Sequence, residues 1–197
     1  MDKPTWRLGM SSDNLGEHSR VLEANPRQLH VDDWRAFRDA LDVIGSERGY
    51  DMVTLPPGPW PLERLPPFRL IMTDARFTPD LFQHLGFYYV SRRFRAAARA
   101  AGGHVAYVPL DLAGSHPAVL GQEYQMLNVI ELGLDDDTPF ALTPTEFDAL
   151  VPTCTDAFAE ALQRARLTGL RFRDAVTHAE RPAPPLLPGD PGSGVAI

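Results

Sequence analysis

Apolar residues recur along the chain at helical and strand spacings, in short segments that follow one another. Trp34, Phe37, Leu41 and Ile44 are separated by three or four residues, so they share one face of a helix. An aspartate at 32 or 33 would cap the N-terminus of this helix, and Gly45 would end it. Apolar, aromatic and alternating stretches elsewhere predict strands at 50–55, 68–73, 87–90, 104–110 and 123–132.

A second predicted helix follows the strand at 87–90. Ser91 occupies the position of its N-cap, and Gly102 and Gly103 end it. Phe94 with Ala97, Ala98 and Ala101 would form its buried face. The middle of the chain therefore predicts a unit of strand, helix, glycine and strand.

A similar unit returns 64 residues later. Thr155 takes the place of Ser91, Phe158 takes the place of Phe94, and Gly169 precedes a further strand at 170–176. Such units are common in proteins, so a chance similarity is the simpler interpretation. A true internal repeat is the alternative, and one pair of units does not decide between them.

Helical and extended segments are interleaved, and several strands alternate between polar and apolar residues. This pattern favours an α+β fold, with a mainly antiparallel sheet and helices packed on one face, over a doubly wound parallel sheet. The prolines between 56 and 67 exclude a helix or a central strand there. We expect one domain over 1–180, with a helix and strand part at 1–55, a proline-rich connector at 56–67 and a core at 68–180. A disordered proline- and glycine-rich tail would follow at 181–197.

The composition is that of a globular chain with an acidic balance. The 197 residues are 44% hydrophobic and 23% charged, which excludes a wholly disordered protein. A net charge of −7 makes a poor general binder of nucleic acid, because phosphate contacts need concentrated Lys and Arg. The sequence also has no apolar run of membrane-spanning length, no secretory signal and a single cysteine. We therefore expect a cytoplasmic protein that binds neither nucleic acid nor membranes.

Sequence motifs for catalysis or cofactor binding are missing. The chain has neither the HExxH nor the CxxC spacing of zinc sites, no phosphate-binding loop and no GxSxG turn. Cys154 precedes a predicted helix, whose N-terminus would favour a reactive thiolate, but a half-buried small residue is the simpler interpretation. We expect no catalytic residue, no cofactor and no metal.

Acidic residues are concentrated in one span of the chain. Eight of them lie between Glu131 and Gln163, where there is no Lys or Arg. This acidic span is either a solvated face or a docking surface for a basic partner, where charge speeds the encounter and apolar neighbours supply affinity. Four arginines share the helix after Ser91 and would form a solvated face, hold an anion or pair with the acidic span: Arg92, Arg93, Arg95 and Arg99.

Five short segments follow one another in a characteristic order. They are TPDLF (78–82), YYVSRRFRAAARAAG (88–102), VAYVPLDL (105–112), YQMLNVIEL (124–132) and DAFAEALQRARLTGLRF (156–172). Together they resemble the immunity proteins encoded beside bacterial polymorphic toxins, in particular the family often called immunity family eleven. The resemblance extends over residues 78–175. It implies a non-catalytic protein that binds one cognate toxin, and it transfers no catalytic residue and no toxin contact.

The acidic span and the resemblance lead to one functional hypothesis. We expect an immunity protein, or antitoxin, that neutralises a toxin or effector encoded next door by steric and electrostatic blocking of its active site. Its toxin-binding residues would be Asp135, Asp136, Asp137, Glu146 and Asp148, with Phe140 and Trp60 as apolar anchors. The alternatives are an adaptor or chaperone for a secretion system, and a hydrolase that reverses a toxin's modification with His84, His104 or His116.

Overall fold

The computed structural model describes residues 5–10, 39–40, 42–43, 68–72, 78–84, 87–135, 137–144, 150–177 and 179–182. Its strands are β1 (Thr5–Met10), β2 (Phe68–Arg69), β3 (Leu81–His84), β4 (Phe87–Val90), β5 (Val105–Asp111), β6 (Gln125–Val129), β7 (Phe140–Pro144), β8 (Leu150–Thr155) and β9 (Leu170–Asp174). Its named helices are α3 (Arg92–Ala100), α4 (Pro117–Leu120) and α5 (Asp156–Arg164). Residues 39–40 and 42–43 are helical too, within the first helix predicted from the sequence.

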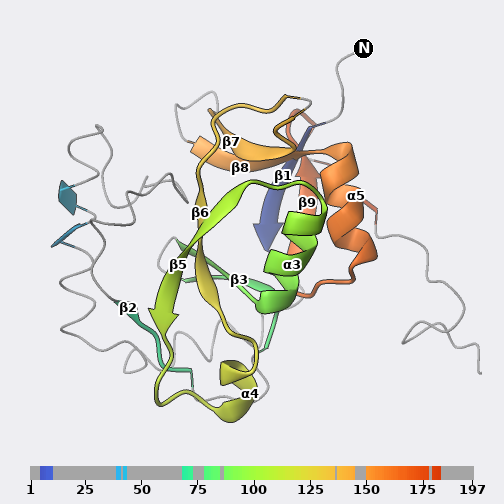
Figure 1. Ribbon diagram of the computed structural model, residues 1–197. Coiled ribbons are helices and arrows are strands. Elements are labelled where there is room, and N and C mark those ends of the chain that lie inside the picture. The colour runs from blue at the N-terminus through green and yellow to red at the C-terminus, as the bar shows by residue number, and fades with distance from the viewer. Residues whose placement is uncertain are drawn as a thin grey trace, which may run out of the picture.

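The strands form two sheets, and the helices α3 and α5 lie side by side against them (Figure 1). One sheet has the order β7-β8-β1-β9 and the other has the order β2-β5-β6-β4-β3. Among the strands that the structure describes, only β2 and β5 pair in parallel. The expected α+β class with mainly antiparallel strands is therefore confirmed, although the strands are divided between two sheets.

The two long helices begin as the sequence predicts. The Ser91 hydroxyl accepts a hydrogen bond from the Phe94 N–H at 3.2 Å, and the Thr155 hydroxyl accepts one from the Phe158 N–H at 3.3 Å. Each cap satisfies a backbone donor that the first helical turn leaves without a partner. The phenylalanine three residues after each cap is buried, so both helices enter the core at the same point of their first turn.

The strands and helices form two units with the same arrangement. The first unit contains β3, β4, α3, β5 and β6, and the second contains β7, β8, α5, β9 and β1. Their strand orders, β3-β4-β6-β5 and β7-β8-β1-β9, place an antiparallel strand between the two strands that the helix connects. The cap N–H of Ser91 donates to the Asp80 carbonyl at 2.9 Å, and that of Thr155 donates to the Pro139 carbonyl at 3.0 Å. The spacing of 64 residues thus corresponds to a repeated three-dimensional arrangement.

Glycines after each helix bring the two units into close contact. A Cβ on Gly103, after α3, would lie 2.8 Å from the Phe158 ring of the second unit. A Cβ on Gly169, after α5, would lie 2.2 Å from the Leu81 carbonyl oxygen of the first unit. The contacts are therefore reciprocal, and each needs a residue without a side chain.

One apolar core continues from the first unit into the second. Buried residues of both helices and both sheets belong to it: Leu81, Val90, Phe94, Ala98, Leu127, Val129, Phe140, Leu142, Cys154, Phe158, Ala159, Leu162 and Phe172. The rings of Phe140 and Phe158 stack at 5.1 Å between centroids, and Phe140 has no exposed surface. This corrects the prediction that Phe140 is an apolar anchor on the surface.

Several predicted segments fall outside the described residues. These are the strand at 50–55, the connector at 56–67 and residues 183–197 of the predicted tail. The first two tail residues belong to the body, because the Arg181 N–H donates to the Phe172 carbonyl at 2.8 Å and the Pro182 carbonyl accepts a hydrogen bond from Gln163. In the part of the chain that is described, no helix is long and apolar enough to cross a membrane.

Candidate interaction surface

The structure describes three of the predicted toxin-binding residues. Asp135 and Asp137 are exposed on the connection between β6 and β7, whereas Phe140 is buried at the start of β7. The other four lie outside the described residues: Asp136, Glu146, Asp148 and Trp60. The structure therefore places one exposed pair of the predicted residues together, and we call Asp135 and Asp137 the acidic turn.

Hydrogen bonds within the acidic turn fix its shape. The Asp135 carboxylate accepts the N–H of Asp137 at 2.9 Å and the N–H of Thr138 at 2.6 Å. Hydrogen bonds from the Thr138 side chain and the Asp137 backbone hold the pKa of the Asp135 carboxyl below its usual value. Asp135 is consequently charged at neutral pH, and the turn presents the exposed Asp137 beside it.

Apolar side chains are exposed just before the acidic turn. Ile130 is 43% exposed and Leu132 is 64% exposed. Two backbone hydrogen bonds join this segment to β7: the Gly133 N–H donates to the Leu142 carbonyl, and the Leu142 N–H donates to the Glu131 carbonyl, both at 2.9 Å. The segment is thus attached to the sheet while Leu132 faces solvent. Charged and apolar groups close together are the combination that protein interfaces use.

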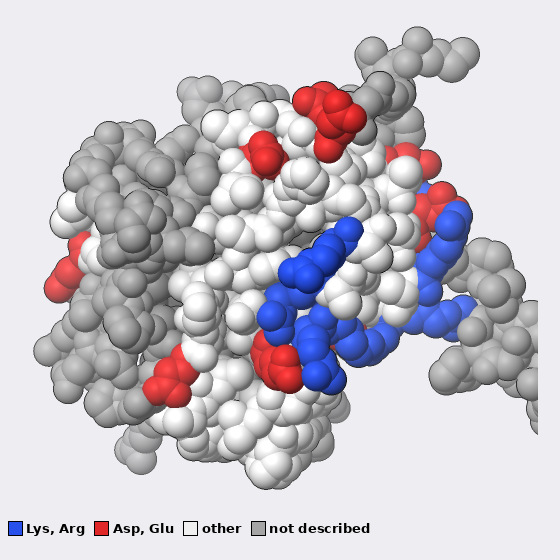
Figure 2. Space-filling model, in the orientation of Figure 1, with Lys and Arg blue, Asp and Glu red and all other residues white. Residues whose placement is uncertain are grey.

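Arginines of α3 pair with carboxylates outside the acidic span. Figure 2 shows arginine side chains gathered in one band across this face of the molecule, and most acidic groups lie apart from that band. Arg92 pairs with Glu123 at 3.1 Å, and Arg93 pairs with Asp80 at 3.1 Å. Neither carboxylate belongs to the acidic span, so these two arginines do not pair with it.

Two acids of the acidic span do pair with arginines, but at α5. Arg164 pairs with Glu160 one turn earlier on the helix, and Arg181 pairs with Asp156 at its first turn. In the described part of the chain, by contrast, no arginine pairs with Asp135 or Asp137. The charge of the acidic turn is therefore directed to solvent.

A buried carboxylate connects the two units near the arginines. Asp80 is 1% exposed, and its two carboxylate oxygens accept four hydrogen bonds. The donors are the Ser91 hydroxyl at 2.6 Å, the Arg93 guanidinium at 3.1 Å, the Thr168 N–H at 2.9 Å and the Thr168 hydroxyl at 3.2 Å. Arg93 also donates to the carbonyls of Ala165 and Arg166 at the end of α5. Because both oxygens are engaged, Asp80 holds the fold together and is not available to a ligand.

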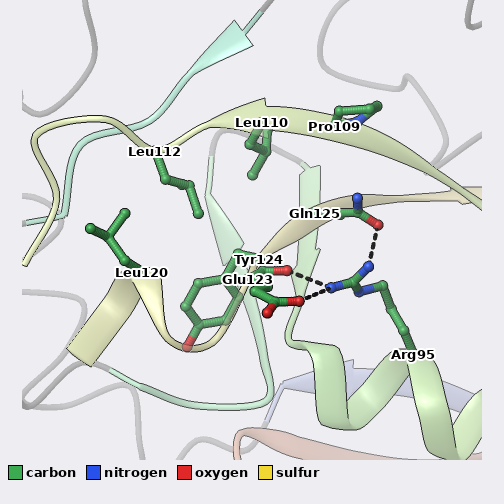
Figure 3. Close-up of a pocket in the computed structure, with 8 residues that line it drawn as sticks. All are labelled: Arg95, Pro109, Leu110, Leu112, Leu120, Glu123, Tyr124 and Gln125. Carbon is green, nitrogen blue, oxygen red and sulfur yellow. Dashed lines mark hydrogen bonds and ion pairs between the residues drawn. The ribbon is translucent and has the colours of Figure 1, made fainter. Parts of the chain in front are cut away.

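A pocket of about 290 Å³ opens between β5, β6 and α4 (Figure 3). Proline, leucine and tyrosine side chains line most of it: Pro109, Leu110, Leu112, Leu120 and Tyr124. At its polar end, Arg95 donates to the Gln125 side chain at 2.6 Å and to the Glu123 carbonyl at 2.7 Å (Figure 3). The guanidinium is therefore held by the wall of the pocket, and we place the candidate site at the acidic turn instead.

The titratable residues that the sequence offered for catalysis lie elsewhere. His104 and His116 are exposed, and neither lines the pocket; His116 Nδ1 accepts the Ala118 N–H at the start of α4. The side chain of His84 is outside the described part of the structure. Burial raises the pKa of the Cys154 thiol, so this cysteine behaves as an apolar core residue. Among the described residues, no cluster of His, Cys, Asp and Glu could hold a metal ion.

Comparison with known proteins does not identify a function, so the function is inferred from the surface features described above. The sequence matches no protein-family model and none of the curated proteins. The most specific exposed feature is the acidic turn, together with the exposed Ile130 and Leu132 next to it in the chain.

Proposed function

We propose that this protein is an immunity protein, which binds one cognate toxin domain in the cytoplasm and blocks its active site. The observation that carries the proposal is the acidic turn. Its carboxylates face solvent, and the described part of the chain gives them no arginine partner, although two other acids of the acidic span have one. Leu132, 64% exposed and three residues before Asp135 in the chain, would supply an apolar contact. The protein works by covering its partner and carries out no reaction.

The physical basis of the proposal is charge complementarity. Exposed carboxylates attract a basic surface before contact and so raise the association rate, and the effect falls as ionic strength rises. A toxin site that binds phosphate groups carries the required positive charge. The apolar side chains then lose their water on contact and slow dissociation.

A charge reversal tests the contribution of the acidic turn. We expect Asp137→Lys to raise the Kd for the toxin domain encoded by the adjacent gene at least tenfold at low salt, and to reduce the salt dependence of Kd. Titration calorimetry at two ionic strengths measures both. Asp137 is chosen because the Asp135 carboxylate also shapes the turn.

Glu180→Lys is the matched control, because Glu180 is an exposed acid beyond β9 and the charge change is the same. We expect it to leave Kd within about twofold of the unmodified chain. Equal effects of the two substitutions would exclude the acidic turn as the docking surface.

The role itself is tested by co-expression. Cells that produce the toxin domain should grow when this chain is present and stop growing when it is absent. An adaptor for a secretion system would bind the toxin domain without restoring growth. Binding without rescue would therefore overturn the proposed function.

A further inference from the structure

Three arginines of α3 form a stripe along one side of the helix. Arg92, Arg95 and Arg99 are three and four residues apart, which places them on one face, and we call them the arginine stripe. Arg92 and Arg95 share one carboxylate, that of Glu123, with N···O distances of 3.1 and 3.8 Å. Arg99 is exposed and pairs with no carboxylate among the described residues. The stripe thus carries three positive charges and pairs with one negative charge, although the net charge of the chain is −7.

The pocket between β5, β6 and α4 adjoins the arginine stripe at Arg95. This arginine lines the pocket, and its guanidinium lies over the Tyr107 ring at 5.9 Å from the centroid. Burial raises the pKa of Tyr107 to about 12, and the positive charges of Arg95 and Arg99 act in the opposite direction, so both guanidinium groups lie near this tyrosine. Positive charge and an apolar cavity are therefore parts of one continuous surface.

The size of the pocket indicates what it can receive. Cavities that enclose a small-molecule ligand measure about 300–1,000 Å³, whereas this one has about 290 Å³ and is open to solvent. Its apolar walls include Leu112 and Leu120, and Leu120 is 42% exposed. The pocket is thus suited to one apolar side chain of a bound peptide, and Arg95 at its polar end is suited to a carboxylate next to that side chain.

The same surface is poorly suited to single-stranded nucleic acid. Such strands bind where their bases can stack on exposed aromatic rings. Tyr124 lines the pocket but is 2% exposed, and the Tyr107 ring has Arg95 over it. The positive charge is therefore not accompanied by a stacking platform on these two tyrosines.

We propose that the arginine stripe and the pocket bind an acidic peptide segment of a partner protein, with one leucine-like side chain in the pocket and flanking carboxylates on Arg95 and Arg99. Arg99 has its guanidinium free of carboxylates in the described part of the chain. Each Nη group of Arg95 makes one hydrogen bond, to Gln125 or to the Glu123 carbonyl, and has a second N–H to donate. This partner is opposite in charge to the one that the acidic turn fits, so the inference does not depend on the proposed function.

A pair of labelled peptides tests the proposal with the full chain. Fluorescence anisotropy at low salt measures the binding of the fluorescein-labelled peptide EEELEEE, for which we expect a Kd below about 1 mM. The matched peptide EEESEEE has the same charge but no apolar side chain, and its Kd should be at least fivefold higher. Failure of EEELEEE to bind, or equal binding of the two peptides, would overturn the proposal.

A charge reversal identifies the surface to which the peptide binds. We expect Arg99→Glu to raise the Kd for EEELEEE at least tenfold, because an exposed attractive charge becomes repulsive. Arg173→Glu is the matched control, since Arg173 is an exposed arginine of β9 that lies outside the stripe and the pocket. This control should leave Kd within about twofold of the unmodified chain. Equal effects of the two substitutions would show attraction to the whole molecule and would exclude the stripe.

A substitution in the pocket tests the apolar contact separately. Leu120→Ser should bring the Kd for EEELEEE close to that for EEESEEE, whereas Val176→Ser, at a residue that is 85% exposed and outside the pocket, should preserve the difference. The same anisotropy assay with a labelled ten-nucleotide oligo-dT tests the alternative partner. Tighter binding of the oligonucleotide than of EEELEEE, with the same loss in Arg99→Glu, would assign the surface to nucleic acid and overturn the proposal.

Discussion

A single buried carboxylate forms hydrogen bonds with both units. Asp80 receives hydrogen bonds from Ser91 at the start of α3 and from Thr168 after α5, so it touches both units. Its position in the first unit corresponds to that of Pro139 in the second, because the carbonyls of both accept the N–H of a helix cap. Proline has no carboxylate, so Pro139 cannot make the side-chain hydrogen bonds that Asp80 makes to both units.

We expect Asp80→Asn to lower the free energy of unfolding by about 3 kcal/mol. An asparagine has the same shape, but its NH₂ group would face donors, and Arg93 would lose its counter-charge. Urea denaturation followed by circular dichroism measures the loss. The control Asp137→Asn, at an exposed site, should change the free energy of unfolding by less than about 0.5 kcal/mol. An equally small loss for Asp80→Asn would show that the hydrogen bonds of the Asp80 carboxylate do not stabilise the fold.

Substitution of two glycines distinguishes the cost of backbone strain from the cost of steric crowding. Gly169 has φ +82° and Gly133 has φ +80°, a region that side chains disfavour. A Cβ at Gly133 would meet nothing within 4 Å, whereas one at Gly169 would lie 2.2 Å from the Leu81 carbonyl oxygen. Gly133→Ala should therefore cost about 1 kcal/mol in unfolding free energy, and Gly169→Ala about 2 kcal/mol more. Similar melting temperatures for the two variants would contradict the close contact.

Phe140 shows the limit of interpreting one residue from its neighbours in sequence. It lies between an acidic stretch and a proline, a context typical of an exposed loop. The sequence also contains a strand signal here, because the apolar residues Phe140 and Leu142 are two positions apart and so share one face of a strand. Both are buried in the core. Two apolar positions are too few to predict a strand. The pairing of β7 with β8 establishes the strand and the face that is buried.

At the scale of the elements, the caps of α3 and α5 form an internal comparison. Ser91 accepts the Phe94 N–H and also donates its hydroxyl to Asp80, whereas Thr155 accepts the Phe158 N–H. Thr155→Ala should lower the free energy of unfolding by about 1 kcal/mol, the usual cost of losing a cap. Ser91→Ala should cost about 1 kcal/mol more, because it also leaves a buried carboxylate oxygen without its donor.

Chemical denaturation of both variants measures these losses. A larger loss at Thr155 than at Ser91 would contradict the additional role of Ser91. The comparison is matched because both residues cap helices of nine residues with a buried phenylalanine in the first turn.

The elements that the sequence predicted well are those with strong local signals. β4, α3, β5 and α5 agree with their predicted positions within a few residues, because caps, glycines and apolar periodicity all indicate the same boundaries. β1 was not predicted, although Trp6, Leu8 and Met10 alternate with other residues. Six residues of alternation are weak support for an isolated strand, and the partners that make β1 a strand are more than 140 positions away.

At the scale of the whole molecule, the shared core makes the two units interdependent. Phe158 of the second unit stacks on Phe140 and also lies against Gly103 of the first unit. We expect the described units to unfold in a single transition, with fluorescence and circular dichroism giving the same midpoint. Phe158→Ala should shift both signals together by the equivalent of about 4 kcal/mol. Separate midpoints for the two signals would contradict a common core.

The sequence by itself determined the class of the fold, the two capped helices, the glycines between each helix and the next strand and the concentration of acidic residues near 135, since these depend on neighbours within a few residues. The tertiary structure decided which strands are neighbours, that the similar segments fold as equivalent units, and that Asp80 is buried between them. Those features depend on contacts between residues far apart in the chain. Local spacing carries no information about such contacts, because the free energy that selects them comes from burying the surfaces of several elements at once.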